Sequence, residues 1–183
     1  MLDLNFQPFP NIQTERLNLR RITEDDLDDM FLLRSNLDAM KHISRPVSVS
    51  NSEVLALIQK VEAGINGNTG IVWGICLNQS NRVIGTIGFH RIEKENYRAE
   101  IGYMLLPEFW SNGIMSEAIK EVIKHGFNSM NLHSIEANID PLNSRSKNIL
   151  LKFGFKKEAY FKENLYFNGK FLDSEIYSLI NLN

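Results

Sequence analysis

The alternation of apolar and polar residues along the chain predicts several β-strands. In residues 99–106, Ala99, Ile101, Tyr103 and Leu105 share one face of a strand, and Glu100 lies on the other face. Residues 134–140 alternate in the same way. Further strands are predicted over residues 16–22, 71–77, 82–92, 160–167 and 170–180. Asn168-Gly169 joins the last two as a two-residue hairpin turn, so we expect about seven strands.

A different period appears between these strands. Residues 115–127 carry one apolar face and one charged face, which is typical of a helix packed on a sheet. Shorter helical patterns begin at Thr23, after the polar stretch 45–52, and at Asn143 or Ser144, where the helix ends near Gly154. The order strand 99–106, helix 115–127, strand 134–140 predicts two parallel strands joined by a right-handed crossover.

The connection from residue 106 to the helix at 115 is the most informative segment. It contains Gly113 in the run Pro107-Glu108-Phe109-Trp110-Ser111-Asn112-Gly113-Ile114-Met115-Ser116. The first turn of a helix has free backbone N–H groups and the positive end of the helix dipole, which together favour a phosphate. The alternative is that Gly113 only permits a tight turn. Asn143 and Ser146 have a similar alternative, because a cap alone explains them.

Composition narrows the class of protein. The chain has 183 residues and a net charge of −2, which suits a single domain over residues 1–183 and gives no electrostatic support for a nucleic-acid partner. No apolar run approaches the roughly 20 residues of a membrane span, and the start of the chain does not look like a signal peptide. We therefore expect a cytoplasmic protein with no membrane partner.

Metal and thiol chemistry have little support in the sequence. The four histidines are scattered and lack metal-ligand spacing, so no metal site is predicted. The single cysteine, Cys76, lies in an apolar strand pattern, where we expect an inert thiol.

Taken together, several motifs resemble those of the GNAT superfamily of N-acetyltransferases, and most closely its ribosomal-protein alanine N-acetyltransferase branch. They are the stretches Thr14-Glu15-Arg16-Leu17, Ala99-Glu100-Ile101-Gly102-Tyr103, Ser116-Glu117-Ala118, Asn143-Ser144-Arg145-Ser146, Lys152-Phe153-Gly154-Phe155 and Asn168-Gly169-Lys170. The resemblance spans nearly the whole chain. It implies an α/β fold with a mixed sheet, flanking helices and a splayed parallel strand pair.

Two positions depart from the family's phosphate-binding loop. Met115 stands where the family usually has Gly or Ala, and we expect its bulk to narrow the loop. Ser111 replaces a frequent glycine, which makes a positive φ at this position less favourable.

The resemblance also implies roles for individual residues toward acetyl-CoA, the co-substrate. Asn143 would hydrogen-bond pantetheine, and Ser146 would lie near the sulfur as the acid that protonates the leaving thiolate, since this helix lacks the tyrosine used elsewhere in the superfamily. Backbone groups would bind the rest of the co-substrate. Those of Met104, Leu105 and Leu106 would bind pantetheine and polarise the thioester. The pyrophosphate would be bound by Asn112, Gly113, Ile114, Met115 and Ser116.

Glu100 is the candidate general base, on the strand beside the opening. The alternatives are that it is an ordinary exposed carboxylate, that a water chain removes the proton, or that Glu136 or Asp140 does so.

The sequence thus predicts direct transfer of acetyl to a primary amine, preferably the N-terminal α-amine of a peptide or protein. A polyamine or aminoglycoside acceptor is an alternative, which the acidic cluster Asp25, Asp26, Asp28 and Asp29 would favour. A non-catalytic acyl-CoA sensor is another. Related folds often pair through sheet edges, so a homodimer is an alternative to a monomer.

Overall fold

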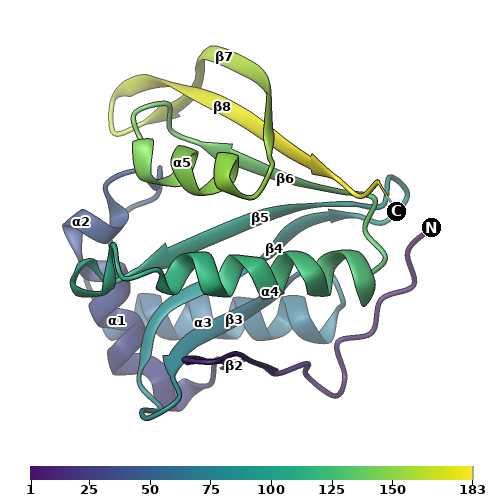
Figure 1. Ribbon diagram of the computed structural model, residues 1–183. Coiled ribbons are helices and arrows are strands. Elements are labelled where there is room, and N and C mark those ends of the chain that lie inside the picture. Colours follow the sequence, from purple (N-terminus) through teal and green to yellow (C-terminus); the bar gives the residue numbers. More distant parts are fainter. Residues whose placement is uncertain (183) are drawn as a thin grey trace.

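A single mixed sheet of eight strands organises the chain, in the order β1-β2-β3-β4-β5-β6-β8-β7. The computed structural model describes residues 1–182 (Figure 1). The strands are β1 (Ile12–Gln13), β2 (Leu17–Arg21), β3 (Ile71–Leu77), β4 (Val83–Glu93), β5 (Arg98–Leu105), β6 (Ser134–Ile139), β7 (Lys156–Phe167) and β8 (Lys170–Ile180). Neighbouring strands are antiparallel except for β5 and β6, which are parallel as predicted.

Helices cover both faces of the sheet (Figure 1). They are α1 (Leu27–Ser35), α2 (Leu37–Met40), α3 (Asn51–Asn66), α4 (Ile114–Asn128) and α5 (Ser144–Lys152), with 3-10 turns at Glu24–Asp26 and Pro107–Phe109. Helices α4 and α5 lie on one face, and α1 and α3 lie on the other. Each face has its own apolar cluster: the larger one packs strands β2–β5 against α4, and the smaller one joins α1 and α3 to β3 and β4.

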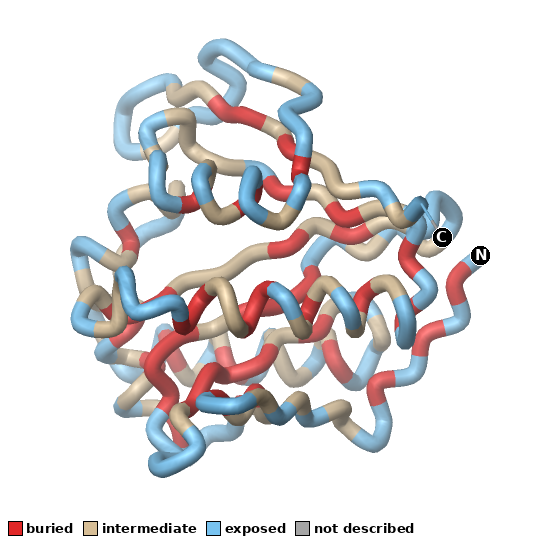
Figure 2. The backbone as a smooth tube through the Cα atoms, viewed as in Figure 1, coloured by how far each residue is buried: buried red, intermediate tan, exposed pale blue. Residues whose placement is uncertain are grey.

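The predicted elements are confirmed, with two additions. The seven expected strands are present, and the eighth, β1, is a two-residue strand paired with β2. Helix α2 was not predicted because four residues are too few for a helical period to show. The terminal hairpin turns at Asn168 and Gly169, with φ of 47° and 76°, as the Asn-Gly pair predicts. The tip of this hairpin is largely exposed (Figure 2).

The mixed α/β fold with a parallel pair at β5 and β6 is therefore the one that the sequence predicts. Within residues 1–182, no helix has the length and apolar character needed to cross a membrane. In the same residues, no three His, Cys, Asp or Glu side chains are grouped so as to hold a metal ion.

Candidate active site

The parallel strands β5 and β6 pair over only three residues and then part. The ladder runs from Arg98 opposite Ser134 to Glu100 opposite Glu136, and β5 continues for five residues beyond it. Figure 1 shows the two strands diverging from this point, with α4 and α5 on the same side of the opening. The predicted splay is thus present.

Backbone groups of β5 face this opening at alternate residues. The Leu106 N–H donates to the Ile84 carbonyl of β4, at 2.9 Å. Because successive residues of a strand direct their N–H groups to opposite sides, Met104 also faces β4, whereas Tyr103 and Leu105 face the opening. The Leu106 N–H is therefore occupied by β4 and is not free for the co-substrate. The Leu105 amide faces the opening, and its role toward the co-substrate stays a prediction.

The loop after β5 turns through two residues of positive φ. Gly113 has a φ of 77° and Ser111 a φ of 61°, so the prediction that serine would disfavour this conformation was wrong. Both sides of Ser111 are held in place: the Trp110 indole N–H donates to the Leu105 carbonyl at 2.8 Å, and Arg16 Nη1 donates to the Asn112 carbonyl at 3.0 Å. These bonds account for a left-handed residue without glycine.

Glu117 fastens this loop to the start of β2. Its carboxylate accepts hydrogen bonds from the Thr14 hydroxyl at 2.5 Å, the Arg16 N–H at 2.9 Å and Arg16 Nε at 2.7 Å. Burial raises the pKa of Glu117, but the bonds from Thr14 and Arg16 outweigh it and hold the pKa below its usual range. Two motifs that are about 100 residues apart in the sequence thus form one clamp.

The first turn of α4 presents free backbone donors. Gly113 precedes the helix, and no side chain caps its first amides. The Met115 side chain is buried in the larger core, so it does not narrow the loop as we expected. The guanidinium of Arg145, on α5, lies 4.2 Å from the centre of the Trp110 ring, which brings a positive charge beside the loop. This arrangement fits a pyrophosphate, because N–H donors, helix dipole and cation converge.

Asn143 and Ser146 lie across the opening, at the start of α5. The Asn143 side-chain oxygen accepts from the Ser146 N–H at 3.1 Å, so Asn143 is the helix cap, and its amide nitrogen remains for another partner. The Ser146 hydroxyl is 2.7 Å from the phenol oxygen of Tyr103, on β5. Burial raises the pKa of Tyr103 to about 12. Tyr103 is a candidate site residue that the sequence analysis did not single out, because it shares the apolar face of the strand and so resembles a core residue.

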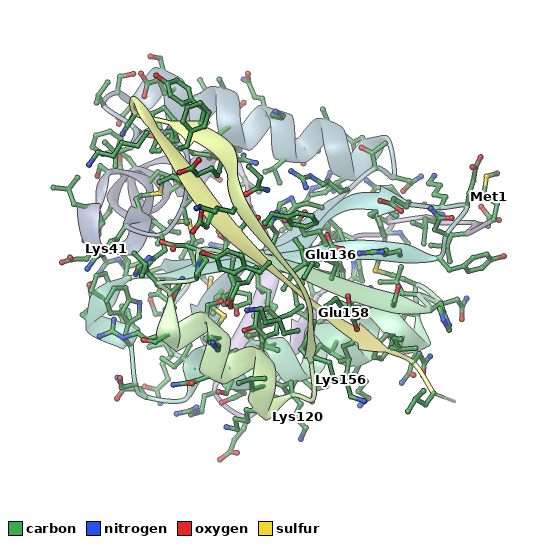
Figure 3. The ribbon with its side chains drawn as sticks, turned by 90° about the horizontal axis from the view of Figure 1, so that it is seen from above. Met1, Lys41, Lys120, Glu136, Lys156 and Glu158 are labelled. Atoms are coloured by element: carbon green, nitrogen blue, oxygen red, sulfur yellow. The ribbon has the colours of Figure 1, made fainter. Side chains whose placement is uncertain are left out.

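Glu100 lies at the last rung of the ladder, on the face of β5 opposite Tyr103. Burial raises the pKa of its carboxyl, against the lowering effect of Arg91 and Arg45. Arg91 Nη1 is 3.0 Å from Oε2 but is not aligned as a hydrogen-bond donor, and this buried oxygen has no hydrogen-bond partner. The alternative bases are more firmly paired. Glu136 forms an ion pair with Arg98, and lies on β6 beside β8 (Figure 3); Asp140 bonds to His42 at 2.7 Å.

A parallel strand pair that parts beside an uncapped helix N-terminus, with a largely buried carboxylate at the point of parting, is the arrangement that the resemblance to N-acetyltransferases implies. Residues 16–156 match the acetyltransferase (GNAT) domain, and the chain belongs to this family.

Two sequences and one solved structure show how it relates to other members. The chain is 37% identical to the uncharacterized N-acetyltransferase YoaA of Bacillus subtilis over 172 residues, which are 94% of this chain and 97% of YoaA. It is 29% identical to the [ribosomal protein uS5]-alanine N-acetyltransferase of Escherichia coli over 108 residues, 58% of this chain and 56% of that protein.

The structure of the RimL ribosomal L7/L12 alpha-N-protein acetyltransferase in complex with coenzyme A superposes with a TM-score of 0.85 at 23% identity. The match covers 93% of this chain and 98% of that one, and it shows the shared fold.

Proposed function

We propose that this enzyme acetylates the α-amino group at the N-terminus of a peptide or protein. The likeness to a ribosomal-protein alanine N-acetyltransferase supports an acceptor of this class. The observation that carries the proposal is the state of Glu100: a desolvated carboxylate, with one oxygen free of hydrogen bonds, at the point where β5 and β6 part.

The chemistry of the acceptor fits such a base. A peptide α-amine has a pKa of roughly 8, whereas a side-chain or polyamine ammonium group has a pKa of about 10. A carboxylate removes a proton more readily from the less basic amine, and a raised carboxylate pKa narrows the difference further. Glu100 therefore suits an α-amine better than a polyamine.

The remaining roles divide between backbone and hydroxyl groups of the chain. Acetyl-CoA, when bound, supplies the thioester from which acetyl is transferred. The free amides of Gly113 to Ser116 hold the pyrophosphate, and those of Tyr103 and Leu105 face the opening, where a donor stabilises negative charge on a carbonyl oxygen. Ser146, bonded to Tyr103, is the hydroxyl placed to protonate the leaving thiolate.

The acidic cluster after β2 gives little support to a polyamine acceptor. Asp26 is buried and accepts from Arg20 and the Thr23 N–H. Asp29 accepts from Arg82 at 3.1 Å and from the Val83 N–H at 2.8 Å. Two of the four carboxylates are thus neutralised within the protein and serve its structure.

Thiol release from acetyl-CoA tests the proposal. Peptides with a free N-terminus are compared with the same peptides blocked at the N-terminus, and with polyamines and aminoglycosides. We expect release with the free peptides and none with the blocked ones. Release with polyamines or aminoglycosides alone would replace the proposal with a small-molecule acceptor, and binding of acetyl-CoA without release to any amine would favour a sensor.

A further inference from the structure

The face of β5 that carries Glu100 gathers more positive charge than the protein neutralises. Three arginines from separate segments lie at this face. The charges of Arg91, near the end of β4, and Arg45, in the loop after α2, lower the pKa of Glu100, and Arg34 on α1 contacts Met104. Figure 3 labels Lys41, which directly follows α2 and begins the segment that contains Arg45. Glu100 is the carboxylate that pairs with Arg91.

Arg34 is the least satisfied of these groups. Its Nε atom is buried and has no hydrogen-bond partner, and its Nη1 atom faces the Met104 sulfur at 3.9 Å. Burial, and secondly the charge of Arg45, lower the pKa of Arg34. Among residues 1–182, no carboxylate forms an ion pair with either Arg34 or Arg45. A partly buried guanidinium without a neighbouring anion costs folding free energy, which a bound anion would recover.

The positive charges of Arg45 and Arg91 also act on His90, the residue of β4 that lies opposite Glu100. Its ring lies over Gly102, where an added Cβ would come within 3.1 Å of the imidazole. Desolvation, followed by the charges of Arg45 and Arg91, lowers the pKa of His90. Because an imidazole is either neutral or positively charged, His90 supplies no negative charge to Arg34 and Arg45.

We propose that Arg34 and Arg45 bind a carboxylate carried by the acceptor, so that the preferred acceptor is a peptide N-terminus with Asp or Glu close behind it. Guanidinium groups bind carboxylates through paired, charge-assisted hydrogen bonds. This inference rests on the proposed α-amine acceptor and names its sequence class.

The spacing along β5 sets where that carboxylate lies. Glu100 and Met104, which Arg34 contacts, are four residues apart on one face of the strand. Four residues span about 13 Å in a strand, and an extended peptide covers that distance in about four residues. With the amine at Glu100, the acidic side chain falls near the fourth position of the acceptor, or one or two positions earlier where the side chains of the arginine and of the acid span the remaining distance.

Matched peptides test the charge preference. We compare kcat/KM for Ser-Asp-Ala-Glu, Ser-Asn-Ala-Gln and Ser-Lys-Ala-Lys N-termini on a common neutral tail. The acidic peptide should react about tenfold faster than its amide counterpart, which is the size expected of a charged hydrogen bond. Free serine and serinamide form a second pair of acceptors, which differ only in the α-carboxylate. A faster reaction of free serine would show that an α-carboxylate, and not a side-chain carboxylate, is recognised.

Variants then assign the effect to the arginines. Arg45→Gln, at an exposed residue, and Arg34→Gln should each reduce the acidic preference, and Arg45→Glu should shift it toward the lysine peptide. Arg82→Gln is the control, because that arginine pairs with Asp29. If Arg34→Gln fails to fold, Arg45→Gln and Arg45→Glu still decide the question.

The outcomes separate the two proposals. Equal rates for acidic and amide peptides, or a preference that survives loss of both arginines, would overturn the carboxylate site while leaving α-amine transfer intact. Transfer to free serine alone would keep the carboxylate site and overturn the peptide acceptor. If the protein binds acetyl-CoA but transfers acetyl to none of the acceptors, both proposals are overturned.

Discussion

The two faces of β5 differ in how their polar groups are satisfied. On the α4 side, the Tyr103 phenol bonds to Ser146, and the Leu105 carbonyl accepts from Trp110. On the α1 side, a Glu100 oxygen and the Arg34 Nε atom are buried without hydrogen-bond partners. Nearly all buried polar groups in proteins find partners, so two exceptions on one surface call for an explanation, and the one that we propose is a bound acceptor.

We propose that this difference separates the two substrates. Groups on the proposed donor side are fixed by internal bonds, as the clamp of Glu117 on Arg16 illustrates. Groups on the proposed acceptor side are left without partners, and in the proposal their charges select the acceptor. The donor side would then be the rigid half of the site, and the acceptor side the half that determines specificity.

The largest effect should come from breaking the donor side at Gly113. Proline cannot adopt the φ of 77° found there and removes an amide donor, so Gly113→Pro should abolish measurable acetyl-CoA binding in calorimetry. Gly169→Pro is the matched control, because Gly169 has a φ of 76° in the distal hairpin. Unchanged affinity in Gly113→Pro would remove the loop from the phosphate site.

On the acceptor side, Glu100→Gln should lower turnover by about 10²-fold or more and leave acetyl-CoA affinity unchanged. A base acts in its deprotonated form, and burial raises the pKa of Glu100, so the wild-type rate should rise with pH through that raised pKa. The variant should lose this rise. Glu136→Gln, opposite Glu100 on the ladder, should keep it. Identical pH profiles for wild type and Glu100→Gln would exclude Glu100 as the base.

Tyr103→Phe tests the bond that crosses the opening. It should reduce kcat about tenfold, because Ser146 loses its partner, with little change in the preference among acceptors. A double-mutant cycle with Ser146→Ala measures the coupling between the two hydroxyls. Strictly additive effects would mean that Tyr103 does not act through Ser146.

The smallest effect on activity should come from loosening the clamp. Glu117→Gln should destabilise the fold by about 2 kcal/mol, the size of hydrogen bonds to a charged group, and weaken acetyl-CoA binding a few fold. Because the folded pKa of Glu117 is lowered, its contribution is complete above the usual glutamate pKa and is lost as pH falls through the lowered value. Urea unfolding should therefore separate wild type and variant at pH 7 and bring them together in acid; an equal gap at both would refute this account.

Sequence patterns predicted the sheet, the main helices and the loop at Gly113, because period and turn chemistry are local properties. They misplaced details that depend on packing. Met115 faces the core and not the loop, and Ser111 adopts a left-handed conformation because distant Arg16 and neighbouring Trp110 hold its flanks. Three separate segments contribute Arg34, Arg45 and Arg91. No spacing pattern in the sequence therefore predicts that these arginines lie on the same face.

The short β5–β6 ladder that ends at Glu100 also determines where the sheet should open locally. Among residues 1–182, three β5–β6 residue pairs are the only strand pairing between strands β1–β5 and strands β6, β8 and β7. We expect the amides of this junction to exchange with deuterium sooner than those of β3 and β4, although they lie in the interior of the sheet. A molecule bound in the opening would add contacts to both halves, so the greatest slowing of exchange should occur at the centre of the sheet and not at its edges.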